Sequence, residues 1–128
     1  MRYAGKVSNM YPTDPVEALK VDEILEVVSE MLSKCPQNKD PEEKKKLREA
    51  FAANNLPVYF NFLSKKSNGS YFVGGKLSIA DLAAYALLKN IRKGDWDFIP
   101  VDSDTKFPGI QQFIDTLETD PALASYKL

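Results

Sequence analysis

The sequence predicts an all-α fold: a bundle of five or six helices around one central, buried helix that begins near Ser78. Apolar residues recur at helical spacing along most of the chain, and two of these segments begin with an Asp-Pro pair. One stretch, Ile79–Leu88, is apolar on every face apart from Asp81, as expected of a helix at the centre of a bundle. No segment alternates apolar and polar residues as a half-buried strand does.

The first segment, residues 1–13, is expected to hold one helical turn and a linker. Pro12 and Pro15 each bias the preceding residue away from helix. Asp14 then suits a helix N-cap, because its carboxylate accepts a backbone hydrogen bond and proline is tolerated at the first helical position. The helix that follows ends at Pro36 and carries one apolar stripe. The stripe consists of Ile24, Val27, Val28, Met31, Leu32 and Cys35.

A second start, Asp40-Pro41, is followed by acidic residues that suit the positive end of a helix dipole. Pro57 lies inside the next apolar pattern, so we expect that helix to kink or to divide in two. Ser78 and Asp81 form a capping box, with Asp in place of the usual Glu, at the start of the central helix.

The rest of the chain predicts an ordered loop and two more helices. Residues 95–107 mix aromatic, proline and short polar side chains, and we interpret the corner around Trp96 as a packing feature rather than a site. Pro108 opens a helix with an apolar face, and a further Asp-Pro pair at residue 120 starts a short last helix that ends near Tyr126.

Composition excludes several classes of function. The 128 residues include no histidine and one cysteine, which rules out a Ser-His-Asp or Cys-His machinery, a disulfide framework and a paired-cysteine zinc site. A net charge of −1 gives no general attraction for nucleic acid. The basic run at residues 44–46 is mixed with acids and fits a solvated helix face. We therefore expect no metal site and no nucleic-acid partner.

The compartment is predicted from the same counts. The first residues lack the apolar core of a secretory signal, and the longest apolar stretch is too short to cross a bilayer. A lone cysteine suits a reducing interior. We expect a cytoplasmic protein without a membrane association.

The run Tyr-Phe-Val-Gly-Gly-Lys-Leu-Ser-Ile-Ala-Asp at residues 71–81 resembles the most recognisable C-terminal signature of the glutathione S-transferase family. Other pieces resemble that family in the same order along the chain. They are Met10-Tyr11-Pro12, Val21-Asp22-Glu23-Ile24, Leu56-Pro57-Val58-Tyr59-Phe60, Phe107-Pro108-Gly109-Ile110 and Asp120-Pro121-Ala122-Leu123. The resemblance covers essentially the whole chain and is nearest to the sigma-like branch.

The resemblance implies a C-terminal helical domain over residues 14–128, preceded in residues 1–13 by the end of the last thioredoxin-like-domain helix and a linker. In this family the thioredoxin-like domain supplies the catalytic residue and most glutathione contacts, and the chain lacks its motifs. We therefore expect no catalytic residue here and no activity of the chain alone. Two interpretations stay open: a fragment of a longer protein, or a separate helical protein.

Several site residues follow from the resemblance. Glu30 takes the place of an acidic residue that reaches the glutathione amino group of the neighbouring subunit in a dimer, with an exposed helix face as the alternative. Five residues are candidates for the pocket that holds an apolar electrophile, although core packing is the commoner fate of Met31 and Cys35. The five are Met10, Tyr11, Met31, Cys35 and Tyr126. Ser78 and Asp81 are expected to be structural caps.

The implied function is conjugation of glutathione, as co-substrate and without a prosthetic group, to apolar electrophiles. The implied partners are a thioredoxin-like domain, or another protein that covers the same face near Tyr3, Met10 and Tyr11, and a second copy in a homodimer. The alternative is a non-catalytic interaction module, similar to the helical domains of translation elongation factor 1 gamma and of aminoacyl-tRNA synthetases. A structural subunit that uses the same fold is a third possibility.

Overall fold

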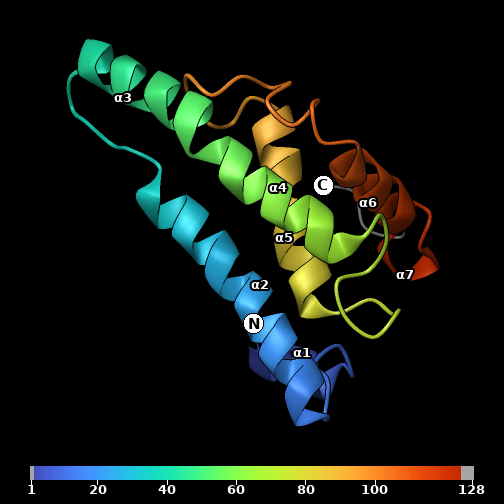
Figure 1. Ribbon diagram of the computed structural model, residues 1–128. Helices are drawn as coiled ribbons and strands as arrows, with labels where there is room; N and C mark the ends of the chain where they lie inside the picture. Colours follow the sequence, from blue (N-terminus) through green and yellow to red (C-terminus); the bar gives the residue numbers. More distant parts are fainter. Residues whose placement is uncertain (1, 125–128) are drawn as a thin grey trace.

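The computed structural model describes the backbone of residues 2–124 and the side chains of residues 3–123 (Figure 1). Helices are the regular elements throughout that range, which confirms the predicted all-α fold. They are α1 (Arg2–Val7), α2 (Pro15–Lys34), α3 (Pro41–Asn54), α4 (Leu56–Ser67), α5 (Ile79–Arg92), α6 (Pro108–Glu118) and α7 (Pro121–Ala124). No helix of the described range is long and apolar enough to span a bilayer.

The Asp-Pro helix starts at Asp14 and Asp40 form as predicted. The Asp14 side chain accepts a hydrogen bond from the backbone N–H of Glu17 at 3.0 Å, and Asp40 accepts one from Glu42 at 3.2 Å. Both capping residues have an extended backbone, and the proline that follows is already helical. Each carboxylate satisfies a backbone donor that the first helical turn would leave without a partner.

Pro57 divides the third predicted helix, and only Asn55 separates α3 from α4. Backbone hydrogen bonding continues across the junction, since the N–H of Asn55 donates to the Phe51 carbonyl at 2.8 Å and that of Tyr59 donates to the Asn55 carbonyl at 3.4 Å. Pro57 has no N–H to contribute, so one bond of the ladder is missing there. The two helices are therefore successive parts of one interrupted rod.

The apolar core lies between α2, α4, α5 and α6. Helix α5 packs against α2 and α6, while α4 packs against α2, α3 and α6. The largest fully buried apolar side chains are Phe60, Phe113, Met31, Leu56, Leu63 and Leu88. Burial of each such side chain contributes about 1.5–3 kcal/mol. The central helix begins where predicted, but one stripe of it, Ala83, Ala86 and Asn90, is half-buried or exposed.

The segment before α2 is attached to the start of α5. The backbone N–H of Ile79 donates to the Met10 carbonyl at 3.0 Å, and the Tyr11 hydroxyl donates to Asp22 at 3.0 Å. Gly5 allows this approach, because a Cβ atom at that position would lie 2.7 Å from the Ile79 side chain. Helix α1 therefore packs on the same end of the bundle as the start of α5.

Asp81 connects the loop before α5 to the first turn of that helix. Its Oδ2 atom accepts hydrogen bonds from the Ser78 backbone N–H at 2.9 Å and the Ser78 hydroxyl at 3.2 Å. Its Oδ1 atom accepts the Phe72 backbone N–H at 2.9 Å. Both residues of the capping box are buried, and the loop between them and Phe72 turns at Gly74 and Gly75, which both have positive φ. The predicted box is thus present, with an additional hydrogen bond from the loop.

The loop between α5 and α6 is attached through a buried ion pair. Arg92 at the end of α5 donates from Nε and Nη2 to the Asp104 carboxylate at 2.9 and 3.3 Å. Asp104 is buried, and two parallel hydrogen bonds from a guanidinium are the strong form of such a pair. This pair attaches the middle of the long connection from α5 to α6 to the end of α5.

Replacement of the capping carboxylate is expected to destabilise the fold more than replacement of the capping hydroxyl. Asp81→Ala removes the partner of two buried donors on Ser78 and of the half-buried Phe72 N–H, which costs about 3 kcal/mol of unfolding free energy, whereas Ser78→Ala costs about 1 kcal/mol. Urea unfolding followed by circular dichroism measures both. Asp115→Ala, an exposed carboxylate paired only with Gln111, is the control and should change stability by less than about 0.5 kcal/mol. Equal losses for Asp81→Ala and Ser78→Ala would contradict the central role of the carboxylate.

Candidate functional site

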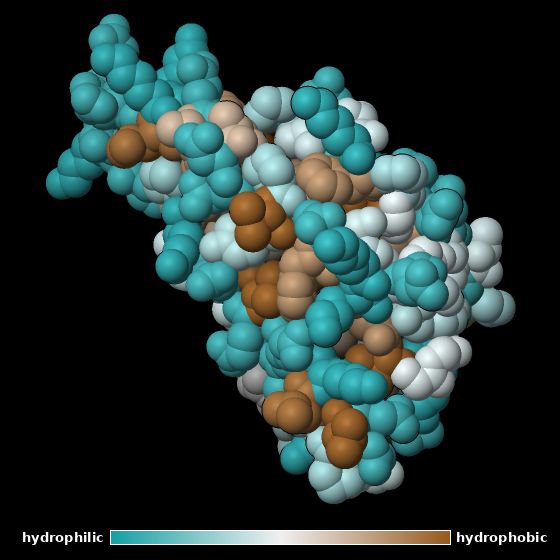
Figure 2. All heavy atoms as spheres, viewed as in Figure 1, coloured by the Kyte–Doolittle hydropathy of each residue, from teal (hydrophilic) through white to brown (hydrophobic). Residues whose placement is uncertain are grey.

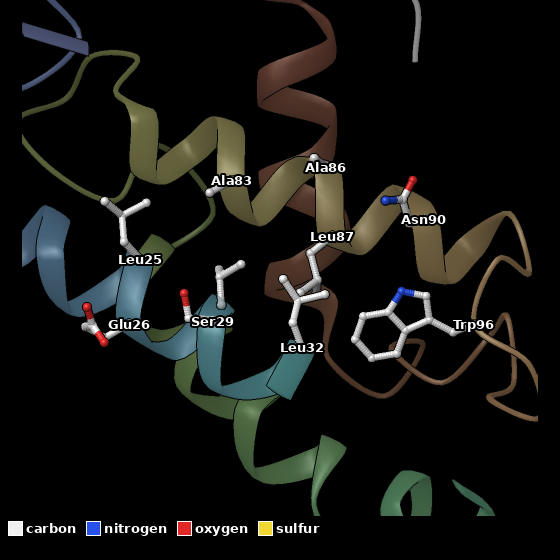
Figure 3. A pocket seen from close by; sticks show the side chains of 10 residues that line it. Leu25, Glu26, Ser29, Leu32, Ala83, Ala86, Leu87, Asn90 and Trp96 are labelled. Atoms are coloured by element: carbon white, nitrogen blue, oxygen red, sulfur yellow. The ribbon is translucent and has the colours of Figure 1, made fainter. Parts of the chain in front are cut away.

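A mostly apolar groove of about 390 Å³ runs between α2 and α5 (Figure 3), and we call it the α2–α5 groove. Its α2 side consists of Leu25, Glu26, Val28, Ser29 and Leu32, its α5 side of Ala83, Ala86, Leu87 and Asn90, and Trp96 adds a further side chain. Leu32 is 56% exposed, so the groove is open to a ligand from solvent. An apolar concavity with a few polar groups is the usual form of a small-molecule site.

The groove arises from the sizes of the side chains that face each other. On α2 the lining residues recur every three or four positions, so they form one stripe along the helix. The corresponding stripe on α5 carries Ala83 and Ala86, whose methyl side chains leave space beside Leu25 and Leu32. Larger residues on that side of α5 would fill the space between the two helices.

Trp96 lines the groove, although the sequence led us to interpret it as part of a packed corner. Figure 3 shows its indole ring beside Leu32 and Asn90. The ring is half-buried, and the Trp96 carbonyl accepts the N–H of Ile99 at 3.1 Å in the turn after α5. A tryptophan just after the central helix, the single one in the chain, was the available signal for this position.

The structure distributes the predicted pocket residues over two ends of the bundle rather than along the groove. Met31 is fully buried in the core, and Cys35 is buried at the end of α2. Met10 and Tyr11 are half-buried near the start of α5. Tyr126 lies outside the described residues. None of the four described candidates lines the α2–α5 groove.

Cys35 has the properties of a core thiol. Burial raises the pKa of its thiol, and the nearby charges of Arg48 and Lys44 lower it only in part. A thiol that stays protonated at neutral pH is a poor nucleophile. The raised pKa and the burial of Cys35 therefore favour a packing role over a reactive one.

Glu30 lies on the exposed side of α2 and does not line the α2–α5 groove. Its carboxylate is 3.7 Å from the Lys34 ammonium, one turn along the helix. Burial, together with a hydrogen bond to Glu30, raises the pKa of the Tyr59 hydroxyl. Glu30 lines a second hollow, which shares Glu26 and Ser29 with the α2–α5 groove.

Asp81 is not part of the groove, although its pKa falls in the range of a general acid. Burial raises the pKa of Asp81 to about 6, while hydrogen bonds from Phe72 and Ser78 partly offset that increase. The side chain has no exposed surface, and its hydrogen bonds serve the start of α5. Within residues 3–123 there is no group of three or more His, Cys, Asp or Glu side chains that could hold a metal ion.

The described residues therefore define a helical domain that offers an apolar groove to a ligand and whose strongly perturbed carboxylate is structural. The family model for the glutathione S-transferase C-terminal domain matches residues 26–127. The chain thus belongs to the glutathione S-transferase C-terminal domain family. A search of curated proteins finds no match to the chain.

The raised pKa of Asp81 predicts a distinctive pH dependence of stability. Because its pKa is higher in the folded chain than the ordinary value of about 3.9, the folded state binds the proton more tightly. Protonation of Asp81 therefore stabilises the fold as the pH falls through about 6 toward 4. Above pH 7 the side chain is ionised, and the burial of its charge destabilises the fold to the full extent. Asp81→Asn removes the titration.

The difference in unfolding free energy between wild type and Asp81→Asn should increase by on the order of 2 kcal/mol in favour of wild type from pH 7 to pH 4.5. Urea unfolding at several pH values measures it, and the other carboxylates cancel because both proteins contain them. A difference that stays constant with pH would show that burial does not raise the pKa of Asp81.

Proposed function

We propose that this chain supplies the hydrophobic side of the substrate site in a sigma-like glutathione transferase, where glutathione is conjugated to an apolar electrophile. The α2–α5 groove is the observation that supports the proposal. Its lining is mostly apolar, its volume of about 390 Å³ lies within the range of roughly 300–1,000 Å³ usual for small-molecule sites, and Leu32 gives access from solvent. Membership of the glutathione S-transferase C-terminal domain family supports the same assignment.

In this proposal the thiol of glutathione is activated by a thioredoxin-like domain. The chain contains no histidine, and burial keeps its only thiol protonated, so its own residues bind and orient the electrophile. Exposed apolar side chains support the presence of such a partner. Tyr3, Val7, Val16 and Leu19 are exposed on α1 and the first half of α2, and Figure 2 shows hydrophobic surface at that end of the molecule.

The proposal also gives Glu30 a role in a cytoplasmic homodimer. Its carboxylate would accept a charge-assisted hydrogen bond from the amino group of the glutathione that is bound to the neighbouring subunit. Its exposed carboxylate has the charge and the access that an ammonium group requires. The Lys34 ion pair on the same helix does not prevent this, because exposed pairs of this spacing contribute only about 0.3–0.5 kcal/mol.

Substitution within the groove tests the proposal on the 128-residue chain. A small aromatic probe such as 2-naphthol should quench the fluorescence of Trp96 on binding. Leu32→Asp should raise the dissociation constant of the probe about ten-fold or more, because a carboxylate would enter an apolar site. Leu47→Asp, an exposed apolar residue outside the groove, is the matched control and should leave the affinity unchanged. Equal affinities for wild type and Leu32→Asp would refute the groove as the ligand site.

The role of Glu30 is tested by glutathione binding to the dimeric protein purified from its source cells, in its wild-type and variant forms. Glu30→Gln removes the charge but keeps the size, so the dissociation constant for glutathione should rise about ten-fold, as measured by calorimetry. Glu43→Gln, an exposed carboxylate on α3, is the control. An unchanged dissociation constant in Glu30→Gln would exclude the cross-subunit contact.

A further inference from the structure

Arg48 joins two chain segments that are far apart in the sequence. Its side chain projects from α3 and is only 5% exposed. The Nε atom donates a hydrogen bond to the Pro36 carbonyl at 2.9 Å, and the Nη1 atom donates to the Asp97 carbonyl at 3.0 Å. One buried guanidinium therefore holds the end of α2 and the turn after α5 together through charge-assisted hydrogen bonds.

The two segments that Arg48 joins carry two facing residues of the α2–α5 groove. Pro36 follows the α2 turn that bears Leu32, and Asp97 is the neighbour of Trp96. Figure 3 shows Leu32 and the Trp96 ring close together at that end of the groove. A change in the distance between the Pro36 and Asp97 backbones would therefore change the width of the groove at this point.

The turn that carries Trp96 includes a residue in an unfavourable backbone conformation. Phe98 has φ of 63°, in the left-handed region that side chains other than glycine rarely adopt. Such a conformation persists only where surrounding contacts hold it. Lys44 adds an ion pair to the Asp97 side chain at 3.3 Å, but that carboxylate is largely exposed and the pair is correspondingly weak. The buried hydrogen bond from Arg48 is the stronger contact.

We propose that Arg48 is a positioning residue, which fixes the turn after α5 and so holds the Trp96 indole at the end of the α2–α5 groove. Held there, the indole selects planar aromatic ligands over saturated ligands of equal size. The ligand preference rests on the proposed function of the groove, whereas the placement of Trp96 does not. A fixed indole face attracts an aromatic ring by offset stacking beyond the area that either ligand buries. A mobile indole would offer both ligands only apolar contact.

The placement of Trp96 is tested first, without ligand. Arg48→Met keeps the apolar stem but removes both hydrogen bonds, so Trp96 emission should shift to longer wavelength and its acrylamide quenching constant should rise about two-fold. Lys44→Met breaks only the exposed ion pair and should leave both quantities unchanged. Unchanged quenching in Arg48→Met, or equal changes in the two variants, would overturn the assignment to Arg48.

The ligand preference is tested by calorimetry with 2-naphthol and its fully saturated analogue, which share the hydroxyl group and the approximate size. Wild type should bind the aromatic probe about ten-fold more tightly than the saturated one. Arg48→Met and Trp96→Leu should each bring this ratio close to one. A role of Arg48 in stability alone would weaken both probes equally and leave the ratio unchanged, which would overturn the proposal.

Two further outcomes separate this proposal from the function on which it rests. If wild type binds both probes with equal affinity, the groove is a ligand site but the indole does not select, and the inference fails alone. If neither probe binds, the proposed function fails and the ligand preference fails with it, while the quenching result still decides the role of Arg48. Should Arg48→Met not fold, Arg48→Lys, which keeps the charge but cannot reach both carbonyls at once, should show smaller shifts in the same direction.

Discussion

The buried Asp81 carboxylate is the group on which the arrangement of the bundle depends. It accepts hydrogen bonds from two separate places, the loop at Phe72 and the start of α5 at Ser78, and so fixes where the central helix begins. The same loop also reaches the junction of α6 and α7, because the Tyr71 hydroxyl donates to Asp120. Since α5 packs against both α2 and α6, the position of its first turn determines how the two sides of the bundle meet.

The groove itself is a consequence of residue size. The buried sides of α5 carry large residues such as Leu88 and Ile91 and fill the core, whereas the stripe that faces α2 near the surface carries Ala83 and Ala86. The proposed site for an apolar ligand needs such space on a rigid frame, and two helices held by a common core provide it.

Helix starts and the capping box could be predicted because their determinants lie within a few residues of one another in the sequence. The residues that line the groove could not be predicted in this way. Met31 lies in the same apolar stripe as the lining residue Leu32, but the packing of α2 turns it into the core. Trp96 reaches the groove through hydrogen bonds between segments distant in the sequence, which no local pattern encodes. The sequence therefore contained the identity of the family and the local structure, whereas the site depended on tertiary contacts.

The two buried side chains of α3, Arg48 and Phe51, both lie in its second half, so the first turns of this helix extend from the bundle with little core beneath them. Amide protons there can exchange with solvent through local fraying, independently of unfolding of the core. Surface substitutions before Arg48 should accordingly have small effects on stability, provided that they keep helical propensity. The first turns of α3 should therefore tolerate substitution, up to the buried residue Arg48.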